Sequence, residues 1–174
     1  KQRLELNDRH DLIWGLGYRR SCDRLRSSPT IHFMDEEDCS GLYDAFAQDD
    51  IVLQPGRWRL SLGARLEHND YTGTSVQPNV RLLWTIDEAS SAWLSLSRAA
   101  RTPARIERSA TINFSAYPNG IPPSSIPSIV QLINEGLDDE RLDALDLGWR
   151  YQLGSVASLD VAAFYYRYSD LRGA

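Results

Sequence analysis

The sequence predicts an all-β fold, an antiparallel up-and-down meander of amphipathic strands. The clearest observation is the segment 57–84, RWRLSLGARLEHNDYTGTSVQPNVRLLW, which contains two alternating runs separated by a polar turn. Trp58 and Leu60 share one face of the first run, whereas Arg59 and Arg65 share the other. A period of two residues indicates strands, and the interruption predicts a hairpin. Each strand has about ten residues, the length that a tilted strand needs to cross a bilayer.

The same alternation predicts the other strands. In chain order they are residues 10–20, 43–53, 92–99, 142–153 and 159–168, and the segment 4–6 is interpreted as the end of an earlier strand. The strand 43–53 has the least regular facing, because Asp49 interrupts its apolar side. The chain 1–174 is therefore predicted to contain about seven strands.

The predicted connections alternate between long and short. Residues 21–40 and 101–140 are long loops, 68–77 is a medium loop, and 54–57, 87–90 and 154–157 are short turns. Prolines exclude a long regular element in 101–140, although 128–135 fits one or two helical turns. Bacterial outer-membrane barrels have this alternation, with short periplasmic turns and long extracellular loops. We therefore expect the chain to be part of a transmembrane β-barrel.

The aromatic residues are consistent with this orientation but do not decide it. Trp58, Trp84, Trp93 and Tyr151 lie close to short turns, where a periplasmic aromatic girdle would be. The same residues would suit the core of a soluble β-sandwich equally well. The alternation of loop lengths is what favours the barrel.

Composition and motifs exclude several classes of function. No apolar run approaches the ~18 residues of a transmembrane helix. The net charge of −5 argues against nucleic-acid binding, which requires clustered Lys and Arg. His10, His32 and His68 lie on different segments without metal-like spacing, and no phosphate-binding loop or nucleophile motif occurs. We expect no catalysis, no metal and no cofactor.

The two cysteines, Cys22 and Cys39, lie in one polar segment outside any metal-binding pattern. A disulfide between them, inside a loop, is favoured over two free thiols, and it requires an oxidising compartment.

An ordered series of motifs resembles a known family. AFAQDDIVLQPGRWRLSLGARLEHNDYTG is followed by QPNVRLLW, SLSRAARTP, ERLDALDLGWRY and SLDVAAFYYRYSDL. In this order they resemble the barrel region of TonB-dependent outer-membrane receptors over roughly residues 9–172. The family usually has Glu before the Leu-Gly of its late strand, where this chain has Asp146. Because the family's plug domain and TonB-interacting segment have no counterpart here, we expect a fragment of barrel wall.

The resemblance implies a bacterial outer-membrane receptor that imports a scarce nutrient, such as a ferric siderophore or another iron chelate. Its implied partners are outer-membrane lipid, its own plug domain, TonB and the small-molecule ligand. Residues on the polar faces or near the loops are candidates for contact with ligand or plug: Arg59, Arg65, Glu67, Arg81, Arg98, Arg101, Asp146 and Arg150. Alternatively, the lumen-side members pair with one another across strands. Arg98 and Arg101 either bind an anionic ligand or, as the family motif suggests, fix the barrel to its plug.

Two other classes of protein remain as alternatives. A complete eight-stranded outer-membrane barrel with an adhesive or structural role would have about this length. A soluble β-sandwich binding module would share the alternating strands. The bilayer-facing prediction for Leu60, Leu62, Leu145 and Leu147 separates the barrels from the sandwich.

Overall fold

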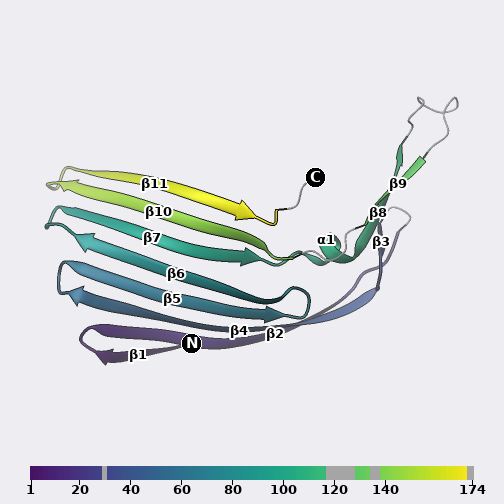
Figure 1. Cartoon of the computed structure of the whole chain (residues 1–174), viewed down its shortest axis with the longest axis horizontal. Coiled ribbons are helices and arrows are strands. Elements are labelled where there is room, and N and C mark those ends of the chain that lie inside the picture. The colour runs from purple at the N-terminus through teal and green to yellow at the C-terminus, as the bar shows by residue number, and fades with distance from the viewer. Residues whose placement is uncertain (29–30, 117–127, 134–137, 172–174) are drawn as a thin grey trace.

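The computed structural model describes residues 1–28, 31–116, 128–133 and 138–171. Eight long strands form one antiparallel sheet in the order β1-β2-β4-β5-β6-β7-β10-β11 (Figure 1). Their bounds are β1 Gln2–Asn7, β2 His10–Arg24, β4 Glu37–Gln54, β5 Trp58–Asn69, β6 Gly73–Thr85, β7 Ser90–Arg101, β10 Glu140–Leu153 and β11 Ala157–Ser169. The predicted up-and-down meander is confirmed, since each strand pairs with its neighbour along the meander.

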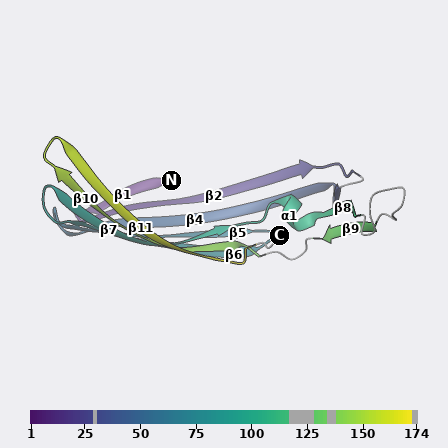
Figure 2. The ribbon, with the colours of Figure 1, turned by 90° about the horizontal axis from the view of Figure 1, so that it is seen from above.

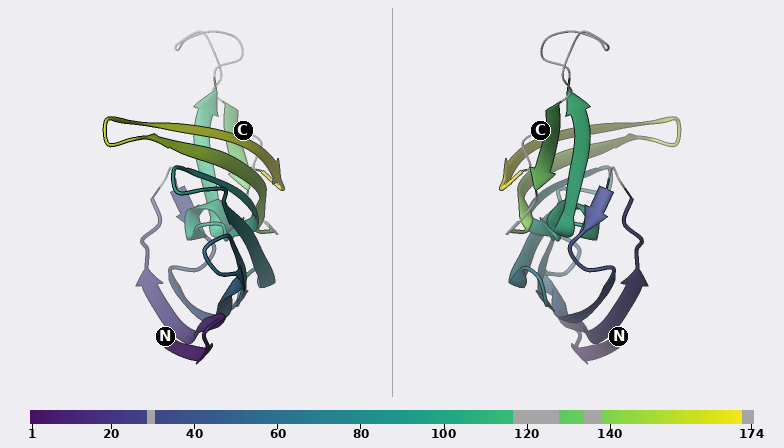
Figure 3. Two further views of the ribbon diagram at one scale, coloured as in Figure 1. Left: turned by 90° about the vertical axis from the view of Figure 1, so that its left-hand side faces the viewer. Right: turned by 90° about the vertical axis from the view of Figure 1, so that its right-hand side faces the viewer.

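The sheet is curved but not closed, because β1 and β11 lie at its opposite edges (Figure 3). A complete eight-stranded barrel would need these two strands to pair with each other. The chain therefore has the architecture of a barrel wall, and the order of its strands does not support the small closed barrel.

The strand register sorts side chains onto two faces. The face that we call apolar contains Ile51, Leu60, Leu82 and Leu94, which lie beside one another on β4, β5, β6 and β7. The face that we call polar contains the residues that alternate with these along each strand, such as Arg59 on β5. Many leucines of the apolar face are exposed, and Leu96 has half of its surface accessible. Within the described ranges, no second layer of strands or helices covers these residues.

Four short connections lie at one end of the sheet, which we call the turn end (Figure 1). The turns at this end join β1 to β2, β4 to β5, β6 to β7 and β10 to β11. Gly56 and Gly154 adopt φ values of 71° and 56° in two of them, a region that favours glycine. The opposite end, which we call the loop end, carries the two long connections and a three-residue turn, 70–72, between β5 and β6. The predicted medium loop 68–77 is therefore wrong, because most of its residues belong to the paired ends of these two strands.

A second, three-stranded sheet lies beyond the loop end (Figure 1). Its strands are β3 (Ile31–Phe33), β8 (Ala110–Ala116) and β9 (Ser128–Ile133), and the short helix α1 (Arg105–Ser109) precedes β8. β3 belongs to the connection between β2 and β4, whereas β8 and β9 belong to the connection between β7 and β10. Phe33 and Ala110 are buried where the two connections meet.

The loops are more regular than the sequence predicts. Residues 21–40 are not one loop, because β2 and β4 continue as a paired ladder to Arg24 and Glu37 (Figure 2). The alternative of helical turns in 128–135 is wrong for 128–133, which form β9. This segment, SIVQLI, is rich in β-branched residues and pairs with β8 along its whole length. Residues 134 and 135, like Tyr117 and most prolines of the long loop, lie outside the described residues.

In the part of the chain that the structure describes, no helix is long and apolar enough to cross a membrane.

Candidate functional site

Most of the predicted site residues lie on the polar face. The register places six of them there, on β5, β6 and β10: Arg59, Arg65, Glu67, Arg81, Asp146 and Arg150. Their side chains contact other residues of this face rather than forming one compact cluster.

Short-range pairs hold several of these residues. Arg65 Nη2 lies 3.4 Å from an oxygen of Asp44 and 3.1 Å from one of Glu67. Arg150 Nε donates to Asp160 at 2.6 Å. These partners come from the same strand or a neighbouring one, so the polar face satisfies part of its own charge. In contrast, Arg59 and Arg81 form no ion pair with any residue that the structure describes.

The side chain of Trp93 also lies on the polar face, although the sequence placed it in an aromatic girdle. The register pairs Trp93 with Leu83 on β6 and with Gly148 on β10, and so separates it from the stacked pair Trp58 and Trp84 on the apolar face. The Arg81 guanidinium lies over the Trp93 ring at 5.2 Å from its centroid. Trp93 thus lies close to a short turn, as the sequence indicates, but on the opposite face of the sheet from Trp58 and Trp84.

Arg98 lies on the apolar face and not on the lumen-type face. It is two residues from Leu96 along β7, and its Nε donates to Asp143 of β10 at 2.7 Å. Because side chains alternate along a strand, Arg98 points away from the polar face. Contact of Arg98 with a ligand or a plug stays a prediction, and the register separates Arg98 from the six candidates on the polar face.

Arg101 joins three elements at the loop end. Its Nη2 lies 3.0 Å from Glu107 Oε2 of α1, and its Nη1 lies 3.0 Å from Glu140 of β10. Glu107 also accepts a hydrogen bond from the backbone N–H of Ala104 at 2.7 Å. Arg101 thus fixes the end of β7 to the start of α1 and to β10. This internal role differs from both roles considered for Arg101 from the sequence.

A cleft of ≈ 300 Å³ opens on the polar face at the loop end. Its floor comes from β2, β4 and β5, and its wall comes from residues 102–105 before and at the start of α1. The polar and charged side chains that line the cleft include Arg19, Ser21, Asp23, Ser40, Glu67 and Arg105. Both signs of charge line the cleft, and Arg19 is exposed in it.

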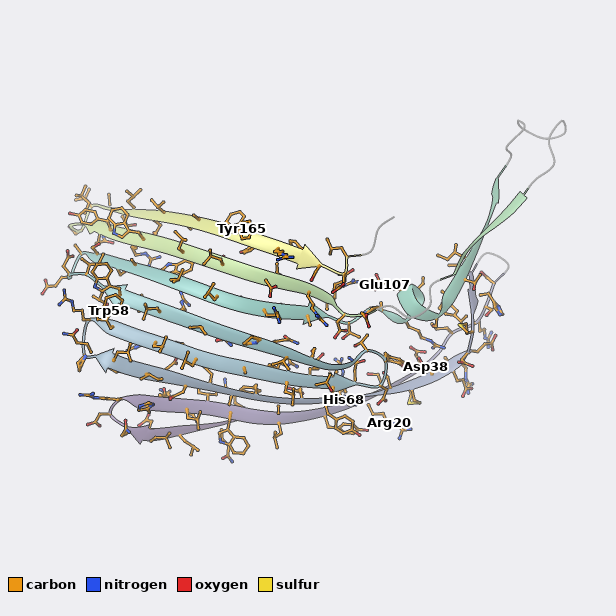
Figure 4. The ribbon with its side chains drawn as sticks, in the orientation of Figure 1. Arg20, Asp38, Trp58, His68, Glu107 and Tyr165 are labelled. Atoms are coloured by element: carbon orange, nitrogen blue, oxygen red, sulfur yellow. A yellow bond between two sulfur atoms is a disulfide. The ribbon has the colours of Figure 1, made fainter. Side chains whose placement is uncertain are left out.

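Arg105 connects the wall of this cleft to its floor. Its side chain is 9% exposed, forms an ion pair with Asp23, and places Nε 3.7 Å from Asp38. The guanidinium also donates to the backbone carbonyl of Asp35 and lies over the Phe33 ring. Tyr71, from the β5–β6 turn, donates its hydroxyl to Asp38 at 2.7 Å. The start of α1, the β5–β6 turn and the paired ends of β2 and β4 therefore meet at one charged cluster around Asp38, which is labelled in Figure 4.

The sequence pattern did not indicate that Asp23, Asp38 and Tyr71 form a site. Asp23 and Asp38 face each other on β2 and β4, Tyr71 lies in the β5–β6 turn, and Arg105 is 82 residues from Asp23. The pattern of each segment alone gives no signal for such a contact. Beside the cluster, Cys22 and Cys39 face each other across β2 and β4 and form a disulfide in the structure. The bond lies inside a strand pair, not in an irregular loop.

The chemistry of the cleft follows from the side chains that line it. No group of three or more His, Cys, Asp or Glu side chains is placed to hold a metal among the described residues. What the cleft offers is a mixture of guanidinium, amide, hydroxyl and carboxylate groups open to solvent, which suits a polar ligand.

An open meander with an apolar and a polar face, and with both of its long connections at the same end, defines a barrel wall. The chain belongs to the TonB-dependent receptor-like β-barrel family, whose model matches residues 1–173. A sequence comparison with curated proteins gives no match.

Solved structures with the same fold are siderophore receptors. A mutant of the ferric enterobactin receptor PfeA of Pseudomonas aeruginosa is 20% identical, with a TM-score of 0.74 over 95% of this chain and 25% of that one. The siderophore receptor PirA of Acinetobacter baumannii is 17% identical, with a TM-score of 0.77 over 93% and 25%. PirA of Pseudomonas aeruginosa is 19% identical, with a TM-score of 0.65 over 95% and 30%. The chain spans about a quarter of the length of the first receptors that it matches.

Proposed function

We propose that the chain is a wall segment of a bacterial outer-membrane receptor that takes up a ferric siderophore with energy from TonB. The apolar face then contacts lipid, the turn end faces the periplasm and the loop end faces the exterior. The polar face lines a lumen that holds the receptor's plug domain. The observation that carries the proposal is the polar cleft at the loop end, at the mouth of this lumen, in a family whose similar structures are siderophore receptors.

The cleft supports capture of an anionic chelate. Arg19 is exposed on the polar face of β2, and a guanidinium binds carboxylates and catecholate-type oxygens through charge-assisted hydrogen bonds. Arg105 is already held by Asp23 and Asp38, so Arg19 is the cation of the cleft that remains accessible to a ligand.

Arg59 and Arg81 support a second contact, with the plug. They are diagonal neighbours on β5 and β6, lie nearer the turn end, and have no carboxylate partner among the described residues. Carboxylates on the surface of the plug would supply ion-pair partners for these two guanidiniums. Asp146, which accepts a hydrogen bond from the Tyr166 hydroxyl at 2.8 Å, provides an acidic group on the same face for a basic plug residue.

The test uses the full-length receptor in detergent and ferric enterobactin as the probe. We expect Arg19→Gln to weaken binding about tenfold, the loss of one charge-assisted contact. Arg57→Gln is the matched control, because Arg57 is an exposed arginine in a turn at the opposite end of the sheet. Equal affinities of both variants and the wild type for the chelate, measured by fluorescence quenching, would contradict a ligand role for the cleft.

A further inference from the structure

The arginines of the apolar face all lie toward the loop end. The register places five on this face: Arg20, Arg24, Arg98, Arg141 and Arg167. Toward the turn end the same face carries aromatic residues instead, including Trp58, Trp84, Trp149 and Tyr151. Figure 4 shows Trp58 at the turn end and Arg20 close to the loop end. The apolar face therefore has a marked charge asymmetry along the strands.

The distance between the two ends matches the thickness of a membrane. On β5, Trp58 and His68 bound the apolar series and are separated by ten residues. At ~3.4 Å per residue and a tilt of ~45°, this separation spans about 25 Å, the height of the apolar band of a membrane barrel. Arg20 and Arg167 lie as far from their own turns as His68 does. These arginines thus lie where one edge of the hydrocarbon region would be.

Three of the arginines lie around one carboxylate on this face. Arg98 and Arg167 flank Asp143 from the two neighbouring strands, and Arg141 lies two residues before Asp143 on β10. We call these four residues the rim cluster. Arg98 pairs with Asp143, whereas Arg141 and Arg167 form no ion pair among the residues that the structure describes. Asp138 and Asp139 line a cleft together with Arg98 and Arg141.

Both unpaired members of the rim cluster are accessible. Arg141 and Arg167 are exposed on the apolar face. Below them on the same strands lie Leu145, Leu147 and Tyr165, which offer apolar surface to acyl chains. A molecule with phosphate groups above acyl chains fits this arrangement, because guanidinium groups bind phosphate in a bidentate manner.

We infer that the rim cluster binds the phosphate groups of lipid in the outer leaflet, with Arg141 and Arg167 as the phosphate ligands. The inference rests on the proposed membrane orientation of the sheet. Asp143 acts as a positioning residue, since its pair with Arg98 keeps the neighbouring guanidiniums close together. The interfacial position and the exposed guanidiniums of Arg141 and Arg167 attract anionic headgroups.

The experiment measures lipid bound to the full-length receptor by native mass spectrometry in detergent. Its probes are phosphorylated lipid A and lipid A from which the phosphates have been removed enzymatically. The test variant is R141Q/R167Q. The control is R9Q/R57Q, which removes the same charge from exposed positions at the turn end. Folding of each variant is checked by the mobility of the unheated barrel on SDS gels.

We expect R141Q/R167Q to bind phosphorylated lipid A about tenfold more weakly than the wild type, and R9Q/R57Q to bind it like the wild type. Removal of the phosphates should weaken wild-type binding to a similar extent. Unchanged binding by R141Q/R167Q, or an equal loss in the control, would overturn the inference. Displacement of lipid A by an equimolar amount of inorganic phosphate would also overturn it, since it would indicate a site for the free anion.

Siderophore binding in the same preparations separates this inference from the proposed function. Loss of lipid A binding in R141Q/R167Q with normal ferric enterobactin binding supports both. If the wild type binds lipid A through these arginines but binds no ferric siderophore, the ligand proposal fails and the lipid inference stands.

Discussion

The indole of Trp93 on β7 covers the backbone of Gly148 on β10. A Cβ atom added at Gly148 would lie only 2.5 Å from Trp93 Nε1, well inside van der Waals contact. The ring occupies the space that any other residue at 148 would need, and its opposite side carries the Arg81 guanidinium. The Leu-Gly motif of this strand therefore has a packing reason on the polar face.

We predict that Gly148→Ala destabilises the sheet by about 1–3 kcal/mol, the usual cost of forcing an extra carbon into a packed site. Trp93 must leave its position, which also removes the contact with Arg81. The free energy of unfolding of the full-length receptor in urea and lipid vesicles measures the effect. In the background of Trp93→Ala the same substitution should cost much less, and additive losses would contradict a direct contact.

The alternation of residues along a strand predicts the face on which each side chain lies, but not its contacts on other strands. Period two assigned Leu60 and Arg59 to opposite faces correctly, and alternating connections predicted the meander. The same period applied to β7 places Arg98 with Leu94 and Leu96, so its face was readable from the sequence. The same period places Trp93 opposite to Leu94, but its contacts with Arg81 and Gly148 depend on the register of β7 with β6 and β10, which the sequence pattern does not contain. Likewise, Arg105 meets Asp38 only through tertiary structure.

The disulfide leads to a prediction about the strands beside the cleft. With Cys22 and Cys39 joined, the non-reduced receptor should contain no reactive thiol from this chain, as measured by a maleimide label after unfolding. Replacing both cysteines with Ser should lower stability by about 3 kcal/mol, the expected effect of a cross-link that closes a loop of about this length. Labelling without a reductant would instead favour two free thiols.

Arg105 should control how tightly the long connection between β7 and β10 is held. The buried guanidinium of Arg105 forms ion pairs with Asp23 and Asp38 and a hydrogen bond with a backbone carbonyl. Arg105→Ala therefore removes the partner that these three groups share. We expect faster amide hydrogen exchange in β3 and α1, by about tenfold or more. Arg26→Ala, at an exposed arginine of the β2–β4 connection, should leave exchange unchanged. Similar exchange in both variants would contradict the role of Arg105.

Asp49 is the one acidic residue of β4 that interrupts its apolar face between the turn end and Tyr43. The structure pairs it with the neighbouring strand, since His10 Nδ1 lies 2.7 Å from Asp49 Oδ2. Its flanking residues across the sheet are Leu12 and Leu62, so the pair lies within an apolar surface. Under the proposed orientation, a single carboxylate there would be exposed to lipid without a counter-charge.

We therefore predict opposite outcomes for single and double substitutions of this pair. His10→Leu should destabilise the receptor by about 1–3 kcal/mol, because Asp49 loses its hydrogen-bond partner. Asp49→Leu combined with His10→Leu should recover most of this loss and can exceed the wild-type stability, since the double variant presents only apolar side chains to lipid. Urea unfolding of the full-length receptor in lipid vesicles gives all the free energies of this cycle. If the double variant is less stable than His10→Leu alone, the apolar face does not contact lipid at this position.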